Sequence, residues 1–592
     1  MLFGKYINKY YKKYFIFFLI GLLALVLVDY FQLEIPRICG LIIDGVKDGS
    51  LFTDENINKM VRYMLYLGLI AFIMFAGRFA WRWAVFGVAV RIESDIREDM
   101  FKHSLGLSNQ YYKQHKVGQL MALYTNDLQT IRQSFGGGTI YAVDALFLGG
   151  IAFYKMVKLN YILALISLIP LTVIMVASLL IGKVMERKHL RRQEAYDDLS
   201  DFAQENFSGI SVIKAFVKEV FEIRQFKKLN QNNYNANVDF IRFSLILDIL
   251  LSFFLSFIVA LLFGGGAYFV IKQTTFFDEV FTSGRLFEFV GYFMSLIWPF
   301  MAVSMLIQLH AQGMASYKRV EEFLDTNIDI VDVDVKDISS IKGKIEFNHL
   351  NFKYPDADEN ILSDISFTID EGQMVGIIGK TGCGKTTIVD LLLRIYNIDE
   401  NMLFIDDIDI MHLPFKKIRD SIGYVPQDNF LFSDTIANNI GFFSEDDISE
   451  EEIEKAAKLA SVHDNIVEFE NKYTTVLGER GVTLSGGQKQ RVSIARALIK
   501  DPAILIFDDS VSAVDTDTES KILSNLREIR RGKTTIMIAH RISTVETLDK
   551  IILMDNGKVV DFGTHNELLS RSNLYKEMVH LQELEKEIGG ED

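Results

Sequence analysis

A run of glycines that ends in a lysine and a threonine is the pattern with the clearest chemistry in this sequence. It reads Gly379-Lys-Thr-Gly-Cys-Gly-Lys385-Thr386 and fits the phosphate-binding loop G-x-x-x-x-G-K-[ST], with an apolar strand before it and an apolar-periodic helix after it. Glycines let backbone N–H groups point at a phosphate, and the helix N-terminus adds partial positive charge. We expect Lys385 to meet the outer phosphates and the Thr386 hydroxyl to ligate magnesium. A glycine turn before a core helix is the alternative, and the motif alone does not separate a transporter from a helicase or a GTPase.

Paired carboxylates follow a second apolar strand. Residues 503–507, Ala-Ile-Leu-Ile-Phe, come directly before Asp508 and Asp509. A buried strand that ends in two acids places one of them beside the magnesium of a bound nucleotide, and Asp508 is the natural choice. The alternative is that the two acids only solvate the end of the strand.

A second glycine motif, Leu484-Ser-Gly-Gly-Gln488, precedes a predicted helix over residues 489–500. A Ser-Gly-Gly run at the start of a helix is an anion-binding site by the same physics as the first loop. One nucleotide needs only one such cradle, so the motif indicates a second role. The alternative is a helix that is merely capped.

The elements that must position these motifs alternate between strands and helices. Apolar strand runs are predicted at 374–378, 503–507 and 534–538, with helical stretches between them, which is typical of a mostly parallel sheet with crossover helices. An alternating segment at 344–350 reads as the first strand. The composition changes beyond residue 325, and we place a linker at 326–343 and an α/β P-loop nucleotide-binding domain, with a helical subdomain, at 344–592.

The N-terminal part is far more apolar and predicts a transmembrane domain over residues 1–325. The chain has 592 residues, 49% of them hydrophobic, which is too many for one ordinary core. A bilayer takes about 20 apolar helical residues per span. We predict an all-α domain of six spans with long cytoplasmic helical extensions, the spans lying at about 14–43, 60–90, 135–157, 159–182, 243–271 and 289–310. The first apolar run could instead be a signal peptide, but its pattern continues through Ile43 without a small-residue cleavage site.

Charge and cysteine usage exclude several classes of protein. The net charge of −15 argues against a nucleic-acid partner. The two cysteines, Cys39 and Cys383, are too far apart in the chain for a disulfide scaffold. Lysines and arginines gather at the N-terminus and in the connections after the second and fourth spans, which predicts a multi-pass protein of the cell membrane whose N-terminus and nucleotide-binding domain are cytoplasmic.

Taken together, the motifs and their order resemble an ATP-binding cassette exporter, as a half-transporter with a membrane domain fused to a C-terminal nucleotide-binding domain. The resemblance covers essentially the whole chain and implies ATP and Mg²⁺ as ligands, a lipid bilayer around the protein and a second half-transporter subunit. It also implies a hydrophobic small-molecule substrate.

The resemblance implies a role for each matching residue. Tyr354 would stack on adenine, Gln427 would sense magnesium, and His540 would contact the γ-phosphate. Lys385, Gln427, Asp508, Asp509 and His540 would form the catalytic set, with Thr386, Gln427 and Asp508 at the metal. The ATP-binding set would be Tyr354, Gly379, Lys380, Thr381, Gly382, Cys383, Gly384, Lys385, Thr386 and Thr387. Ser485, Gly486, Gly487 and Gln488 would close on the partner's ATP.

Further segments match the family less directly. Gly478 to Gly481 resembles the exporter cross-talk loop, and Ser512 to Asp515 resembles the loop that faces the partner. In the membrane half, Gly118-Gln-Leu with Asn126-Asp127, and Gly209 to Lys214, look like the two cytoplasmic coupling segments.

Position 509 departs from the family pattern. Most members have glutamate there to polarise the attacking water, and aspartate is one methylene shorter, so its carboxylate sits about 1 Å back from the water. The chain therefore resembles the degenerate-site subunit of a heterodimeric bacterial multidrug exporter, whose partner supplies the glutamate. The alternative is a homodimeric lipid or peptide exporter in which Asp509 is the working base.

The substrate is predicted to be large and apolar, and cationic in part. The sixth span offers adaptable and aromatic side chains, and three aspartates are predicted at membrane depth, where charges are costly and often functional. These residues are Phe293, Met294, Trp298, Phe300, Met301 and Met305, with Asp29, Asp144 and Asp248. Plain packing is the alternative for the first group, and Asp144 or Asp248 could simply pair with Arg78. An ATP-gated channel or a soluble cassette protein would be alternatives for the whole chain, but a long regulatory insert is absent and a membrane half is present.

Overall fold

The computed structural model describes residues 4–51, 57–277, 279–444, 448–478, 481, 483–510 and 515–588. The chain divides into two compact units. The first comprises Met1–Ser104 with Val117–Thr326, and the second comprises Leu105–Lys116 with Asn327–Asp592.

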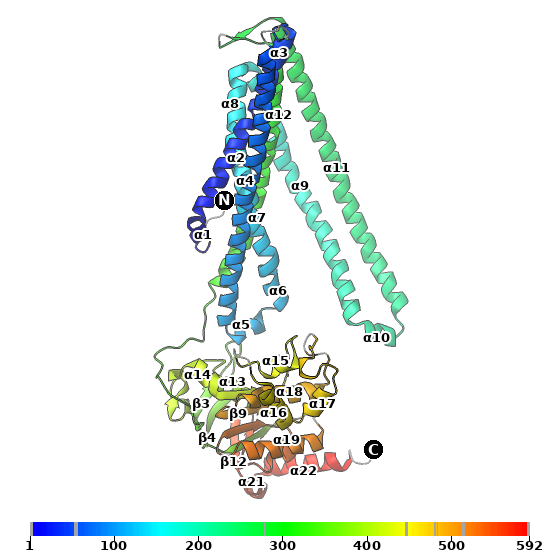
Figure 1. Ribbon diagram of the computed structural model, residues 1–592. Coiled ribbons are helices and arrows are strands. Elements are labelled where there is room, and N and C mark those ends of the chain that lie inside the picture. The colour runs from blue at the N-terminus through cyan, green and yellow to red at the C-terminus, as the bar shows by residue number, and fades with distance from the viewer. Residues whose placement is uncertain are drawn as a thin grey trace. The chain divides into compact units, whose positions relative to one another are not determined.

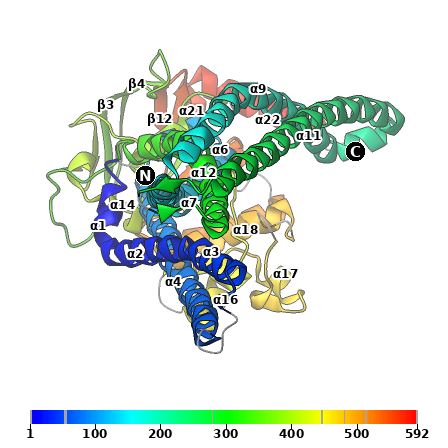
Figure 2. The ribbon, with the colours of Figure 1, turned by 90° about the horizontal axis from the view of Figure 1, so that it is seen from above.

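The first unit is helical throughout, apart from one short hairpin. Its helices are α1 (Asn8–Lys13), α2 (Phe15–Gln32), α3 (Glu34–Lys47), α4 (Ile57–Gly106, continuing just past the unit's edge), α6 (Val117–Ala122), α7 (Leu128–Val143), α8 (Gly149–Leu159), α9 (Tyr161–Ser208), α10 (Ile210–Ala215), α11 (Glu219–Ile271) and α12 (Ser283–Leu324), with single π-turns η1 (Leu123–Asp127) and η2 (Asp144–Leu148) and the hairpin β1 (Thr275–Phe276) and β2 (Glu279–Val280). Helices α9 and α11 run side by side and are joined by α10 (Figures 1 and 2).

Helix length and composition confirm a multi-span membrane domain. Five helical stretches are long and apolar enough to cross a bilayer: Phe15–Lys47, Ile57–Gly106, Val117–Leu159, Glu219–Ile271 and Ser283–Leu324. The span predicted at 159–182 starts with the shorter apolar stretch Tyr161–Pro170 and continues as α9, but most side chains of residues 171–183 lie outside the described residues. At 1.5 Å per residue the 53 residues of α11 measure about 80 Å, so the predicted extensions beyond the bilayer are present.

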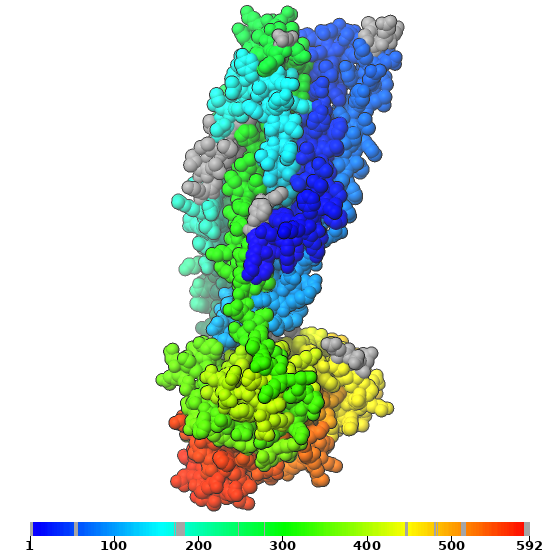
Figure 3. Space-filling view, turned by 90° about the vertical axis from the view of Figure 1, so that its left-hand side faces the viewer, coloured from blue at the N-terminus to red at the C-terminus, as the bar shows by residue number. Residues whose placement is uncertain are grey.

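Small residues and caps fix how these helices pack. A side chain at Gly77 would meet Val28, and one at Gly21 would meet Val85, so α2 and α4 approach closely along their length. The Asn160 side chain caps α9 by accepting hydrogen bonds from two backbone N–H groups. The N-terminal segment is tied to the end of α12, since Lys5 and Tyr6 both bond Asp325. Figure 3 shows the dark blue N-terminal helices beside the green of α12.

The second unit is an α/β domain built on two sheets. The six-stranded sheet has the order β12-β11-β5-β10-β9-β8 and the four-stranded sheet the order β4-β3-β6-β7. The strands are β3 (Ile345–Phe352), β4 (Leu362–Ile369), β5 (Met374–Gly379), β6 (Leu403–Ile405), β7 (Ile408–Asp409), β8 (Ile422–Val425), β9 (Ile504–Asp508), β10 (Thr534–Ile538), β11 (Lys550–Asp555) and β12 (Lys558–Gly563). All neighbours in the larger sheet are parallel except the β11–β12 edge pair.

Helices cover the larger sheet and form a separate group near its β8 edge. They are α5 (Asn109–Gln114), α13 (Lys385–Leu392), α14 (Phe415–Ser421), α15 (Ile436–Ile440), α16 (Glu450–Leu459), α17 (His463–Val467), α18 (Gly486–Ile499), α19 (Thr516–Ile529), α20 (Ile542–Val545), α21 (His565–Arg571) and α22 (Asn573–Ile588), with 3₁₀ turns η3 (Ile410–His412) and η4 (Lys472–Thr474). Two buried clusters form the core, one containing residues of α15–α18 and the other lying between the two sheets. The predicted mostly parallel sheet and the helical subdomain are both confirmed.

Candidate functional site

The glycine loop joins β5 to α13, and its backbone needs glycine at defined points. Gly382 and Gly384 have φ of +83° and +95°, a region that side chains rarely adopt. A Cβ at Gly379 would lie 2.3 Å from the Met554 carbonyl oxygen. Both the backbone conformation and the close packing therefore require glycine in this loop.

Lys385 is buried within this loop. Its ammonium donates to the carbonyls of Gly379, at 2.9 Å, and Lys380, at 3.0 Å. Backbone carbonyls thus accept hydrogen bonds from the ammonium inside the turn of the loop. A cation that binds phosphate has to lie at this position. The Cys383 thiol lies 4.0 Å from the same ammonium.

Asp508 and Thr386 form the part of the site that suits a divalent cation. The Thr386 hydroxyl donates to Asp508 Oδ1 at 3.2 Å, while Asp508 Oδ2 is buried without a hydrogen-bond donor among the described residues. Burial raises the pKa of the Asp508 carboxyl, and the hydrogen bond from Thr386 opposes the rise. A buried oxygen without a donor, next to a hydroxyl, is a donor set that Mg²⁺ prefers. The residues present therefore fit the ion.

Asp509, Gln427 and His540 come together beside Asp508. The Gln427 side-chain amide donates to Asp509 Oδ2 at 3.4 Å, and His540 Nε2 lies 4.0 Å from the same oxygen. Asp509 has φ of +46°, and its backbone N–H donates to the Ile538 carbonyl at 3.0 Å. The chain thus leaves the strand conformation directly after Asp508, and both carboxylates line the same cavity.

One cavity of about 300 Å³ unites these groups. Its lining includes Tyr354, Thr381, Gly382, Gly384, Lys385, Thr386, Thr387, Gln427, Asp508, Asp509 and His540. Of the predicted ATP-binding and catalytic residues on this side, Gly379, Lys380 and Cys383 are outside this lining.

Tyr354 lies at the edge of the cavity in a cluster of aromatic rings. Its hydroxyl and that of Thr387 are 2.9 Å apart, and its ring meets Phe352 and Tyr396 edge-on at 5.1 and 5.2 Å between centroids. Lys113 also reaches this cluster, bonding the Tyr396 hydroxyl at 3.0 Å. The sequence reasoning missed Lys113 and Tyr396, and only the aromatic and basic character of residues 110–116 hints at such a contact.

The residues of the Ser485 motif are not part of the lining of the cavity that contains Lys385 and Asp508. Ser485 caps α18 with a reciprocal pair of bonds to Gln488, at 2.9 and 3.3 Å, and both Ser485 and Gly486 are exposed. A Cβ at Gly486 would meet nothing within 4 Å. Residues 479–480 of the predicted cross-talk loop and 512–514 of the predicted partner-facing loop lie outside the described residues, whereas Asp515 caps α19.

The membrane unit holds buried polar groups that the sequence analysis singled out. The Trp298 indole N–H donates to Asp144 Oδ2 at 2.6 Å, and both Asp29 and Asp144 are at least 94% buried, with exposed fractions of 4% and 6%. Asp29 Oδ2, Asp144 Oδ1 and the Trp81 indole N–H are buried without partners among the described residues. Asp248 is exposed on α11.

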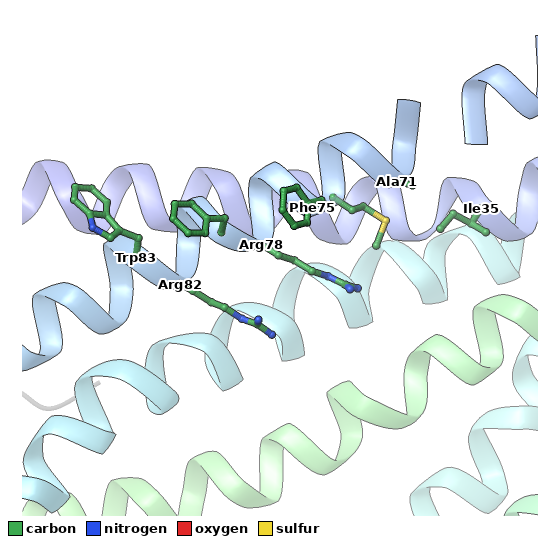
Figure 4. A pocket seen from close by; sticks show the side chains of 8 residues that line it. Ile35, Ala71, Phe75, Arg78, Arg82 and Trp83 are labelled. Atoms are coloured by element: carbon green, nitrogen blue, oxygen red, sulfur yellow. The ribbon is translucent and has the colours of Figure 1, made fainter. Parts of the chain in front are cut away.

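Two cavities among the described residues of this unit bear on the predicted substrate site. One, of about 370 Å³, is lined by Phe86, Gln133, Gly137, Tyr141, Met305, Gln308, Leu309 and Gln312. Only Met305 was among the predicted cavity residues, although the spacing of 305, 308, 309 and 312 marks one face of a helix. The other, of about 860 Å³, is lined by Ile35, Ala71, Met74, Phe75, Arg78, Phe79, Arg82 and Trp83, with both arginines extending from the same side of α4 (Figure 4). Among the described residues Arg78 pairs with neither Asp144 nor Asp248.

Comparison with known proteins matches both units. Residues 18–300 match the family described as "ABC transporter transmembrane region" and residues 362–512 the family described as "ABC transporter". The chain is 36% identical over 585 residues to "Probable multidrug resistance ABC transporter ATP-binding/permease protein YheI" of Bacillus subtilis (strain 168), covering 98% of this chain and 97% of that one.

Two further matches cover nearly the whole chain. It is 33% identical over 582 residues to "Multidrug resistance-like ATP-binding protein MdlA" of Escherichia coli (strain K12), covering 98% of this chain and 96% of that one. A solved structure titled "Structure of a bacterial Atm1-family ABC exporter with ATP bound" matches with a TM-score of 0.74 and 26% identity, covering 97% of this chain and 98% of that one.

Proposed function

The chain belongs to the ABC transporter family, with a membrane-spanning part and a cytoplasmic domain that couples ATP hydrolysis to transport, and on that premise we propose which exporter it is. We propose one half of a heterodimer that exports hydrophobic compounds, cationic ones among them, across the cytoplasmic membrane by alternating access. In this proposal residues 1–325 form the transmembrane domain, 326–343 the linker and 344–592 the nucleotide-binding domain. The multidrug names of two relatives support the substrate class.

ATP binding at the chain's own site rests on the phosphate loop. Lys385 would exchange the carbonyls of Gly379 and Lys380 for the outer phosphates, since its ammonium already lies in the turn. Backbone N–H groups of the loop would hold the remaining phosphate oxygens. Mg²⁺, when bound by Thr386 and Asp508, would neutralise charge on the phosphates.

In the proposed heterodimer the two ATP sites differ in their rate of hydrolysis. The observation that supports this difference is the aspartate at position 509 and its surroundings. Its carboxylate accepts from Gln427 and lies near His540, so it faces the cavity. An aspartate there is a methylene short of the water that it would polarise, and general-base catalysis contributes roughly 10² to 10⁴-fold. We propose that this chain's own site holds ATP mostly unhydrolysed.

The exposed Ser485 motif would serve the other nucleotide. It lies outside the chain's own cavity, and its glycine has open space, so a partner's triphosphate could approach the start of α18. Two such chains, different or alike, would enclose two nucleotides between them. Closing on ATP would shift the membrane unit toward an outward-open state, and hydrolysis would release it.

The experiment compares three variants in the purified complex. Asp509→Ala should barely lower ATP turnover, whereas Ser485→Arg should nearly abolish it by blocking the partner's nucleotide. Asp509→Glu tests whether hydrolysis can be restored at this site. A loss on Asp509→Ala as large as that on Ser485→Arg would contradict the proposal and favour a homodimer in which Asp509 is the working base.

The buried aspartates support a cationic component in the substrate range. Asp144 is held by Trp298, whose ring lies 6.1 Å from Tyr141 at the wall of the smaller cavity. Carboxylates and aromatic rings in that arrangement attract organic cations. Dye efflux from vesicles tests this, and unchanged transport of every cationic dye by the combined Asp144→Asn and Asp248→Asn variant would remove the acidic part of the proposal.

A further inference from the structure

The segment Leu105–Lys116 packs with the nucleotide-binding unit, although in sequence it lies between the membrane helices α4 and α7. Its fold is fixed locally by α5 and by two contacts to the linker: the Ser108 hydroxyl bonds Asp329 at 3.3 Å, and Gly106 packs on Ile328. The segment is therefore a connection between two membrane helices that is anchored on the ATP-binding domain.

Lys113 is the residue of this segment that approaches the nucleotide cavity. Its ammonium donates to the Tyr396 hydroxyl at 3.0 Å, and it lies over the rings of Tyr396 and Tyr354 at 5.5 and 5.3 Å from their centroids. The hydrogen bond to Tyr396 raises the pKa of Lys113, so the cation persists at neutral pH. One ammonium thus contacts two neighbouring aromatic rings.

Tyr354 connects this cation to the phosphate loop. Its hydroxyl bonds the Thr387 hydroxyl in α13 at 2.9 Å, and its ring lines the cavity that holds Lys385 and Asp508. Its edges are fixed by Phe352 and Tyr396. The ring therefore lies between the anchored segment and the helix that starts at the phosphate loop.

We propose that Lys113 is a positioning residue for the base of the nucleotide, acting through Tyr354. The inference rests on the proposed role of Tyr354 as the base contact. A cation over an aromatic face holds the ring in place, so a base that stacks on the ring meets a surface already ordered. Because coupling between two sites is reciprocal, a bound base also holds Lys113, and with it the segment that continues from α4.

The test separates the base from the phosphates. In the assembled complex, ATP or inorganic tripolyphosphate, which has no base, competes with a photoreactive ATP analogue before irradiation, and the analogue crosslinked to this chain is then measured. Lys113→Met keeps the side-chain stem and removes the charge. It should raise the concentration of ATP needed for displacement about two- to five-fold, the range of an exposed cation–π contact, and leave that of tripolyphosphate unchanged.

Matched variants make the result specific. Lys113→Arg keeps the cation and should keep the ratio of the two displacement constants, and Lys116→Met, on the same segment, should leave the ratio alone. In a Tyr354→Ala background Lys113→Met should add nothing. Equal weakening of ATP and tripolyphosphate, or a Lys113→Met effect that persists without Tyr354, would overturn the inference.

The two proposals fail in different ways. If Tyr354→Ala leaves the ratio of ATP to tripolyphosphate unchanged, the ring is not a base contact, and the role that the family resemblance implies for Tyr354 is wrong. If Tyr354→Ala alters the ratio and Lys113→Met does not, the ring binds the base without Lys113, and only the inference about Lys113 is wrong.

Discussion

The phosphate loop and the Ser485 motif are both glycine-rich turns before a helix, yet the folded chain treats them in opposite ways. The first is enclosed: Lys385 is buried, and Gly379 and Gly384 lie against backbone or side chains that leave no room for a methyl group. The second is open: Ser485 and Gly486 are exposed, and beyond the neighbouring residues of its own helix no described atom lies within 4 Å of a Cβ at Gly486. Packing within the chain therefore requires glycine at Gly379 and Gly384, whereas the described residues give no packing reason for glycine at position 486.

The largest effect is expected on ATP affinity, when Lys385 in the enclosed turn is replaced. Lys385→Ala removes the only cation buried within the described phosphate loop, so we expect ATP affinity at this chain's site to fall by at least 100-fold. Crosslinking of labelled azido-ATP at micromolar concentration measures it. Lys416→Ala, at an exposed lysine of α14 outside the cavity, is the control, and undiminished crosslinking of Lys385→Ala would contradict the assignment of the phosphate loop.

A pair of glycine substitutions tests the contrast of enclosed and open turns directly. Gly379→Ala places a methyl against the Met554 carbonyl and should cost about 1–3 kcal/mol of stability, measured as a lower melting temperature of the purified chain. Gly486→Ala should leave the melting temperature unchanged or slightly higher, because alanine favours a helix. It should nevertheless lower ATP turnover of the complex. Equal loss of stability in both variants would show that the second turn is also fixed by its own chain.

A smaller effect, on thermal stability, is expected at Asp390 in α13, the helix that follows the phosphate loop. Burial raises the pKa of Asp390 to about 6, above the ordinary value near 4, so ionisation opposes folding and the stability contribution falls as the pH rises from about 4 to 6. Asp390→Asn should therefore raise the melting temperature by about 2–4 °C at pH 7.5, with the gain shrinking below pH 5. Thermal unfolding at both pH values checks this. A gain that is the same at pH 4.5 would show that charge is not its cause.

The strands, the long helices and the main contacts of the phosphate loop could be predicted because each depends on a local pattern. Glycine spacing, apolar runs and paired carboxylates singled out Lys385, Thr386 and Asp508, and the structure brings these three residues to one cavity. Contacts between distant segments could not be predicted. Lys113 reaches Tyr396 across 283 positions, and Trp298 reaches Asp144 across 154. Periodicity says which face of a helix is buried, but which residue meets it is set by packing of the whole unit.

Arg78 and Arg82 affect how one subunit inserts into the bilayer before it assembles with its partner. Each lies exposed on a membrane helix without an ionic partner among the described residues, and insertion measurements put the cost of a central arginine at about 2.5–3.5 kcal/mol. Helix α11 likewise leaves most of its apolar surface uncovered by its own chain. A newly inserted subunit without its partner therefore carries the cost of these two arginines in the bilayer. If the partner is the different chain that we propose, the amount of assembled exporter in the cell should follow the scarcer of the two subunits.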